Sequence, residues 1–298
     1  MIKIAFGCIT FESDFVLKEA LASVYPYAEQ ILIAEGPVQY WQDQGKTTST
    51  DETNAILESF PDPRGIIKVI HGHFAEKNSQ CKTYMPYLRD DIDYIWNLDS
   101  DEIYKPEDIE KIIKILTDEK YTSVGIRSCS FYGGFNRYIT GFEEACDNFL
   151  RIFKVCPGAT WLTHRPPTIQ YPSGYFITPK HLNSDELFFN YSVRFYHYSY
   201  VWPRQVHDKI EYYKAAVSKH KCIDNYYNRV YLPWVMGTHE ERENIEIHFL
   251  GVHEWLPQYR GPTFTKPFTG EHPEIIKKAM PQLEEKFKEQ LRIYGRKS

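Results

Sequence analysis

The sequence predicts an α/β fold with a mostly parallel sheet and helices on both of its faces. Short apolar runs alternate with amphipathic segments over about the first 120 residues, and each run has the length of a buried strand. Three of these runs end in polar clusters, at residues 10–13, 35–37 and 99–102. Ligands of such sheets bind at the carboxyl ends of the strands, so we expect the functional site there.

The individual elements follow from periodicity and from capping residues. We expect Ser13 or Asp14 to cap the first helix, and Ser49-Thr50-Asp51-Glu52 to cap the second. Pro106 suits the first turn of a later helix. The predicted strands span residues 2–9, 30–34, 66–70 and 93–98, and the predicted helices span residues 15–24, 55–57, 79–88 and 107–116.

Beyond Tyr121 the pattern changes to aromatic, strand-like segments at residues 123–132, 149–155 and 193–200. We expect these as antiparallel additions at one edge of the sheet. Residues 240–273 show little periodicity, and an amphipathic helix is expected over residues 273–294.

Composition limits the classes of function. The 298 residues are 42% hydrophobic, which is enough to bury the core of one large domain. The net charge of -5 is spread without long blocks of one sign, so no nucleic-acid partner is expected. No apolar run approaches the roughly 20 residues of a spanning helix, and the six cysteines form no C-x-x-C pair. We therefore expect a cytoplasmic protein with reduced thiols and no transmembrane segment.

The strongest chemical signal is the segment IWNLDSDEI, in which Asp99 and Asp101 directly follow an apolar strand. Side chains at i and i+2 of an extended backbone point the same way, so the two carboxylates can converge on one divalent cation. The alternative is a solvated turn whose aspartates cap the next helix.

Several short motifs follow one another along about residues 1–215. They are Thr10-Phe11-Glu12, Glu35-Gly36, Ser49-Thr50-Asp51, LDSDE at residues 98–102, Arg151-Ile152-Phe153, Trp161 with His164, His197-Tyr198-Ser199-Tyr200, Lys209, and Tyr212-Tyr213. In this ordered set the chain resembles the glycosyltransferase A fold, and specifically family 2 glycosyltransferases of the lipopolysaccharide glucosyltransferase kind. The chain departs from the common pattern at Glu35-Gly36-Pro37 and in the long insert at residues 38–48.

The resemblance implies a single catalytic domain over residues 1–215, with the donor half at about 1–120, the acceptor half at about 121–215, and an extension at 216–298 packed on it. It implies Mn²⁺ or Mg²⁺ on Asp99 and Asp101, with His197 as third ligand or His164 as the runner-up. If His164 is not a metal ligand, it is expected in an acceptor pocket together with Trp161. The nucleotide-sugar contacts that it implies are Thr10, Glu12, Glu35, Lys77, Asp99 and Lys209.

These residues together predict transfer of a sugar from a nucleotide-diphosphate sugar to a hydroxyl of a glycan, lipid-linked or protein acceptor, with inversion. An inverting transfer needs a base, and Glu143, Glu144 and Asp147 are the candidates. The alternatives are a sugar-phosphate nucleotidyltransferase, a metal-dependent hydrolase built on His71, His73 and Asp99, and a carbohydrate-binding relative without turnover.

Overall fold

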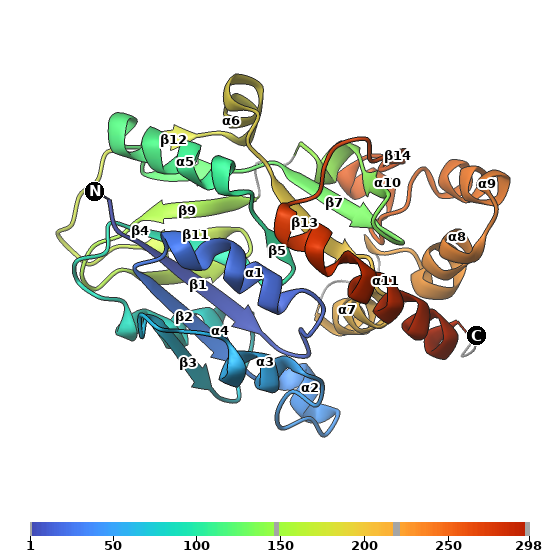
Figure 1. The fold of residues 1–298 in the computed structure, drawn as a ribbon, viewed down its shortest axis with the longest axis horizontal. Helices are drawn as coiled ribbons and strands as arrows, with labels where there is room; N and C mark the ends of the chain where they lie inside the picture. The colour runs from blue at the N-terminus through green and yellow to red at the C-terminus, as the bar shows by residue number, and fades with distance from the viewer. Residues whose placement is uncertain (1, 146–148, 217–220, 296–298) are drawn as a thin grey trace. The chain divides into compact units, whose positions relative to one another are not determined.

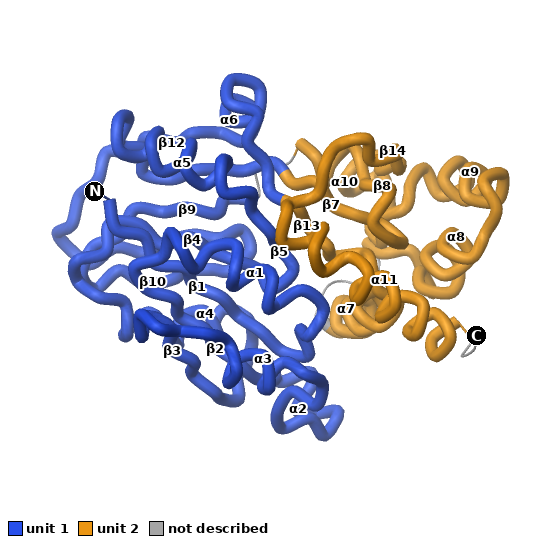
Figure 2. Tube along the Cα trace, viewed as in Figure 1, with its two compact units in different colours: residues 1–127, 147–195 blue, residues 128–146, 196–298 orange. Residues whose placement is uncertain are grey.

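The computed structural model describes residues 2–145, 149–216 and 221–295. The chain forms two compact units (Figure 2). Unit 1 comprises residues 1–127 and 147–195, and unit 2 comprises residues 128–146 and 196–298. This division does not test the predicted domain boundary near residue 215, which stays a prediction.

Unit 1 is built on a sheet with strand order β12-β6-β9-β4-β1-β2-β3. The strands β1 to β4 are mutually parallel where they pair, β9 is antiparallel to both β4 and β6, and β12 is parallel to β6. The mostly parallel sheet that the sequence predicts is therefore confirmed. The strand bounds are β1 Ile4–Thr10, β2 Gln30–Glu35, β3 Ile67–His71, β4 Tyr94–Asp99, β6 Ser123–Gly125, β9 Leu150–Lys154 and β12 His181–Leu182.

Helices cover both faces of this sheet (Figure 1). On one face Phe6 stacks on Trp96 at 5.2 Å, and apolar side chains of α1, α3 and α5 join them in the core. On the other face α4 packs against β1, β2 and β10. The remaining elements of unit 1 are α1 Leu17–Val24, η1 Tyr25–Tyr27, α2 Gln39–Asp43, α3 Thr53–Ser59, α4 Lys77–Tyr84, η2 Met85–Tyr87, β5 Glu102–Ile103, α5 Pro106–Glu119, β10 Thr160–His164, β11 Pro167–Gln170 and α6 Ser184–Tyr191.

Unit 2 contains strands in the order β14-β8-β7-β13, in which β8 is antiparallel to both β14 and β7, and a set of helices. Its core is aromatic, and Tyr132 lies at its centre, with Trp234 and Tyr231 edge-on to its ring. The elements are β7 Ser128–Tyr132, β8 Arg137–Ile139, η3 Gly141–Glu143, β13 Phe195–Tyr200, α7 Pro203–Ala216, η5 Tyr227–Tyr231, α8 Leu232–Met236, α9 His239–Phe249, α10 Pro257–Arg260, β14 Thr265–Pro267 and α11 Glu274–Tyr294. No described helix has the length and apolarity needed to cross a membrane.

The cap predicted for the first helix is wrong. Helix α1 begins at Leu17, and its N-cap residue Val16 makes no side-chain hydrogen bond. The backbone N–H of Ser13 donates instead to Thr53 Oγ1 (2.7 Å), so this segment is bound to the start of α3 rather than to its own helix.

Two further differences concern the later strands and helices. The segment predicted as one strand at residues 123–132 is divided into β6 and β7, and β9 lies inside the first sheet rather than at its edge. Helix α9 overlaps residues 240–273, where the sequence shows little periodicity. The helix has no apolar stripe, since Glu246 is its only buried residue, and periodicity therefore could not reveal it. Its capping box, Thr238 with Glu241, was the available signal.

Gly36 lets the chain leave β2 at close range to a neighbouring backbone. Its φ is +141°, and a Cβ there would lie 1.9 Å from the carbonyl oxygen of Gly72. Gly45, in the loop that follows, also has a positive φ of +81°, but no atom lies within 4 Å of where its Cβ would be.

We expect Gly36→Ala to lower the free energy of unfolding by about 3 kcal/mol or more, because it adds overlap to backbone strain. Gly45→Ala is the matched control and should cost only about 1 kcal/mol, from strain alone. Urea denaturation of both variants measures the difference, and equal losses would contradict the steric argument.

Candidate functional site

The acidic turn after β4 places three carboxylates within four residues. Asp99 is the last residue of β4, Asp101 lies in the turn, and Glu102 begins β5. The Asp99 side chain is 27% exposed, whereas the Glu102 side chain is fully buried. Asp99 therefore lies partly exposed at the carboxyl end of β4, Asp101 is half-buried in the turn, and Glu102 lies inside the protein.

A buried arginine from β9 binds this turn. Arg151 Nε lies 2.9 Å and 3.0 Å from the two oxygens of Glu102, and Arg151 Nη2 contacts Glu102 Oε1 as well. The same Nη2 donates to Asp99 Oδ2 at 3.1 Å. Burial alone lowers the pKa of a guanidinium, but the charges of Glu102 and Asp99 outweigh it and raise the pKa of Arg151 above its ordinary value. Arg151 is therefore a permanent cation inside the acidic turn.

The donor set of the turn fits a divalent cation. Carboxylate oxygens are the ligands that Mg²⁺ and Mn²⁺ prefer, and Asp99 and Asp101 supply them at a strand end. Glu102 is neutralised by Arg151 and also accepts a hydrogen bond from Tyr104 (3.2 Å), and one of its oxygens lies within 4.8 Å of an oxygen of Asp99. The predicted ligand pair Asp99 and Asp101 is compatible with this arrangement and stays a prediction.

Two basic side chains lie in the same region as Asp99. The charges of Lys77, Arg165 and Asp99 all contribute to the pKa shifts of the buried pair Cys81 and His164. Lys77 is the first residue of α4, where the sequence analysis expected a nucleotide or phosphate contact. The residues predicted from the sequence did not include Arg165. Its position directly after His164 in the THRPP segment could have indicated it.

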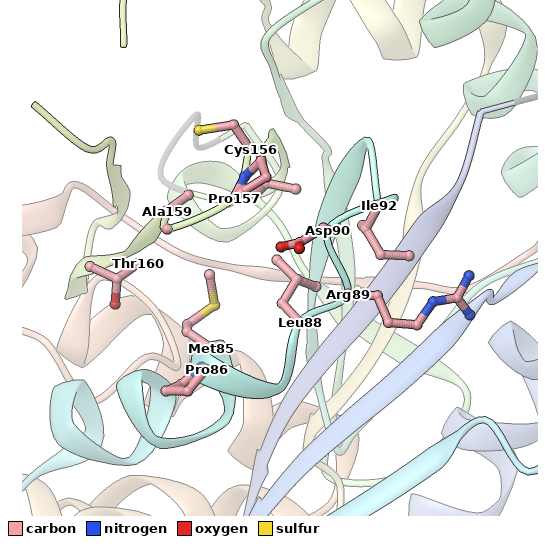
Figure 3. A pocket seen from close by; sticks show the side chains of 12 residues that line it. Met85, Pro86, Leu88, Arg89, Asp90, Ile92, Cys156, Pro157, Ala159 and Thr160 are labelled. Atoms are coloured by element: carbon pink, nitrogen blue, oxygen red, sulfur yellow. The ribbon is translucent and has the colours of Figure 1, made fainter. Parts of the chain in front are cut away.

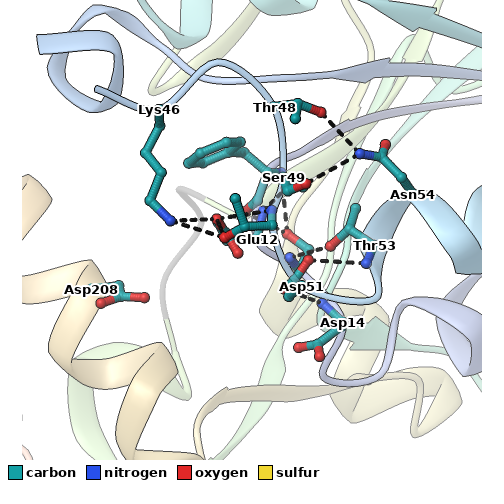
Figure 4. Close-up of polar contacts among 12 residues, drawn as sticks. Glu12, Asp14, Lys46, Thr48, Ser49, Asp51, Thr53, Asn54 and Asp208 are labelled. Atoms are coloured by element: carbon teal, nitrogen blue, oxygen red, sulfur yellow. Dashed lines mark hydrogen bonds and ion pairs between the residues drawn. The ribbon is translucent and has the colours of Figure 1, made fainter. Parts of the chain in front are cut away.

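The residues predicted at the ends of β1 and β2 anchor a loop (Figure 4). Glu12 Oε1 accepts hydrogen bonds from the Thr50 hydroxyl (2.7 Å) and from Lys46 Nζ (2.9 Å). Glu35 is 1% exposed; its Oε1 accepts from the Ser49 hydroxyl (2.7 Å), and its Oε2 lies 2.9 Å from His71 Nδ1. Both carboxylates thus hold the insert at residues 38–48 and the two residues that follow it, and their contact with a nucleotide stays a prediction.

Thr10 and Gln80 complete these strand ends. Thr10 is 3% exposed, and its hydroxyl has no hydrogen-bond partner among the described residues. Gln80 Nε2 donates to the carbonyl oxygen of Ala34 (2.9 Å) and lies 3.3 Å from those of Thr10 and Gly36. One buried amide from α4 therefore ties the carboxyl ends of β1 and β2 together.

Comparison with known proteins decides the family. The model of glycosyl transferase family 2 matches residues 47–199, which is 153 of the 298 residues. The chain belongs to glycosyl transferase family 2. The family predicted from its motifs is therefore confirmed.

Other comparisons are more distant. A search of curated proteins finds no match. Among solved structures, S. aureus TarS 1-349 is 10% identical with a TM-score of 0.39, and the match covers 83% of this chain and 72% of that one. The chain covers 28%, 45% and 47% of the length of the first three TarS structures. Glucosyl-3-phosphoglycerate synthase from Mycobacterium tuberculosis is 15% identical over 44% of each chain, with a TM-score of 0.27. These likenesses are too slight to support an argument.

Trp161 and His164 of the glycosyltransferase are core residues. Trp161 is 1% exposed and its Nε1 donates to the Tyr84 hydroxyl at 2.8 Å. His164 is 6% exposed, with its Nδ1 3.3 Å from Cys81 Sγ. Burial, followed by the charge of Arg165, lowers the pKa of His164 to about 3, so the ring is neutral at ordinary pH. Their contact with an acceptor stays a prediction, which this burial does not favour.

In unit 2 of the glycosyltransferase, two more predicted residues are engaged locally. Lys209 Nζ donates to both the carbonyl and the hydroxyl oxygen of Ser199 and lies 4.1 Å above the ring of Tyr200. His197 Nδ1 lies 3.3 Å from the Ser130 hydroxyl. The roles predicted for Lys209 and His197 are not tested by these contacts.

The candidate bases differ in their surroundings. Glu143 is buried, and its Oε1 lies 2.8 Å from His253 Nε2, while His253 Nδ1 lies 2.9 Å from Glu254. Burial opposes protonation of the His253 ring, but the carboxylates of Glu254 and Glu143 outweigh this effect and raise the pKa of His253 to about 9. The resulting imidazolium lowers the pKa of Glu143 despite burial, which weakens it as a base. Glu144 is half-buried, and Asp147 lies outside the described residues.

The glycosyltransferase also has a pocket of about 310 Å³ at the opposite edge of the sheet (Figure 3). Its lining includes Met85, Leu88, Asp90 and Ile92, which precede β4, and Cys156, which follows β9. Because β9 is antiparallel to β4, this is the edge where the parallel strands begin. The pocket is therefore remote from the acidic turn.

The neutral ring of His164 predicts a pH dependence of stability. Its pKa of about 3 in the folded chain lies below the value of 6.5 of an exposed ring, so unfolding takes up a proton between these values. The stability from the neutral ring is complete above about pH 6.5 and is lost as the pH falls toward 3.

We expect His164→Asn to reduce the slope of the unfolding free energy against pH by up to about 1.4 kcal/mol per pH unit between pH 6 and 4. His239→Gln, whose side chain is 78% exposed, is the control and should leave the slope as it is. Urea titrations at a series of pH values measure both, and identical slopes in wild type and His164→Asn would refute the assignment.

Proposed function

We propose that this glycosyltransferase requires a divalent cation, Mn²⁺ or Mg²⁺, bound by Asp99 and Asp101, and transfers a sugar from a nucleotide-diphosphate sugar to an acceptor hydroxyl with inversion. The acidic turn carries the proposal, because Asp99 and Asp101 lie at the carboxyl end of a parallel strand while Glu102 is neutralised inside. A bound cation supplies charge stabilisation to the departing diphosphate. Lys77 and Arg165 supply further positive charge in the same region.

The proposal includes the acceptor and the base. The acceptor is a hydroxyl of a glycan, of a lipid-linked sugar or of a protein. The base that takes its proton is one of Glu143, Glu144 and Asp147, and the ion pair of Glu143 with His253 favours the other two. We propose His197, which is among the residues with a ligand atom placed to hold a metal ion, as the third ligand.

The rival hydrolase built on His71, His73 and Asp99 loses support. His71 ends β3 and Asp99 ends β4, and β1 and β2 lie between these strands. Three strand spacings separate them by about 14 Å, too far for one metal ion. In addition, His73 Nε2 lies 2.8 Å from the carbonyl oxygen of Thr47.

We expect Asp101→Ala to lower Mn²⁺-stimulated turnover of the best sugar nucleotide about 1,000-fold, because the cation contributes several kcal/mol at the transition state. The fold should survive, since Asp101 lies in the turn between β4 and β5 and is only half-buried. Release of nucleoside diphosphate, measured with Mn²⁺ and with EDTA over a panel of sugar nucleotides, is the assay.

Asp90→Ala is the control for this experiment, because Asp90 is an exposed aspartate at the other edge of the sheet. It should retain wild-type turnover. Full turnover of the wild type in EDTA would rule out the metal requirement, and NMR of the product anomer separates inversion from retention.

A further inference from the structure

Arg151 occupies an irregular position on its strand. In the pairing of β6 with β9, Val124 lies opposite Ile152 and Gly125 lies opposite Leu150, so the register shifts by one residue. Arg151 is the extra residue of this β-bulge. A bulge re-aims a side chain relative to the regular alternation of a strand, and here it aims the guanidinium at the acidic turn.

The guanidinium is held on several sides. Its carbon lies 5.2 Å from the ring centre of Phe149 and 5.4 Å from that of Phe195, and the side chain is 4% exposed. Nε and Nη2 bind Glu102, which is fully buried. The orientation of the guanidinium is therefore fixed independently of Asp99.

One nitrogen of this fixed group binds the partly exposed carboxylate of the turn. Nη2 donates to Asp99 Oδ2 at 3.1 Å, while the Asp99 side chain keeps 27% exposure. A donor that cannot move restricts the rotation of the carboxylate that it binds. Residues that orient a metal ligand in this way typically contribute 10- to 100-fold to metal affinity.

We infer that Arg151 is a positioning residue that holds Asp99 in the orientation for binding a divalent cation, and that Glu102 is the anchor of Arg151 rather than a ligand. This inference rests on the proposed metal requirement. It separates two functions that the sequence places side by side in LDSDE, since Asp99 and Asp101 serve the cation and Glu102 serves the arginine.

The electrostatic effect of Arg151 has to be separated from its positioning effect. Loss of Arg151 alone leaves the buried Glu102 carboxylate uncompensated, which destabilises the fold strongly. Arg151→Met combined with Glu102→Gln removes one positive and one negative charge, so the net charge near Asp99 is unchanged. Arg151→Lys keeps the charge but replaces the fork by a single point donor.

We expect both the double variant and Arg151→Lys to bind Mn²⁺ at least about 10-fold more weakly than the wild type, in the presence of a saturating nucleoside diphosphate. Mn²⁺ binding is followed by electron paramagnetic resonance of the free ion, and circular dichroism verifies the fold. Arg89→Met is the matched control, because Arg89 pairs with Asp91 at the surface and should leave Mn²⁺ affinity unchanged.

Wild-type Mn²⁺ affinity in folded Arg151→Lys would overturn the inference, and so would wild-type affinity in the folded double variant. If one of the two fails to fold, the other decides. Asp101→Ala distinguishes the two proposals. A wild-type chain that binds no Mn²⁺, or whose binding ignores Asp101→Ala, refutes the metal requirement itself. Binding that depends on Asp101 but not on Arg151 refutes only the positioning role.

Discussion

The ion pair between Arg151 and Glu102 determines what the end of β4 can do. A carboxylate with no exposure, such as Glu102, is costly to ionise unless a cation and hydrogen bonds compensate it. Arg151 supplies both from the neighbouring strand, with Tyr104 as a further donor. Because Arg151 neutralises the inner carboxylate and also donates to Asp99, one buried cation holds both carboxylates at the end of β4.

Polar residues at the carboxyl ends of the strands have two different tasks. At the end of β4 they present charge outward. At the ends of β1 and β2, Glu12 and Glu35 instead bind Lys46, Ser49 and Thr50, and so hold the insert at residues 38–48 and the residues after it in place. The insert departs from the common family pattern, and the glutamates that it binds stand where a nucleotide contact was expected. The structure thus links the unusual insert to the unusual strand ends.

The sequence predicted what local pattern controls. Apolar periodicity located β1 to β4, α5 and α11, and D-x-D located the turn. It did not predict the partner of the turn, because the direction of Arg151 depends on a bulge in the pairing of β6 with β9. It also did not reveal that Glu143 pairs with His253, since the two are 110 residues apart. Nor did it show that Trp161 is enclosed, because burial depends on how β10 packs against α4.

The charges around Asp99 also limit the kind of ligand. Lys77 and Arg165 bring positive charge to the region that contains Asp99, and the same charges help to keep His164 neutral. A cation alone would be attracted by the aspartates and repelled by the basic side chains. An anion alone would be attracted by the basic side chains and repelled by the aspartates. A cation bridged to phosphate oxygens satisfies both sets of charges at once. The mixture of carboxylates and basic groups therefore favours a metal–diphosphate complex over either component alone, which is the chemistry of a nucleotide-diphosphate sugar.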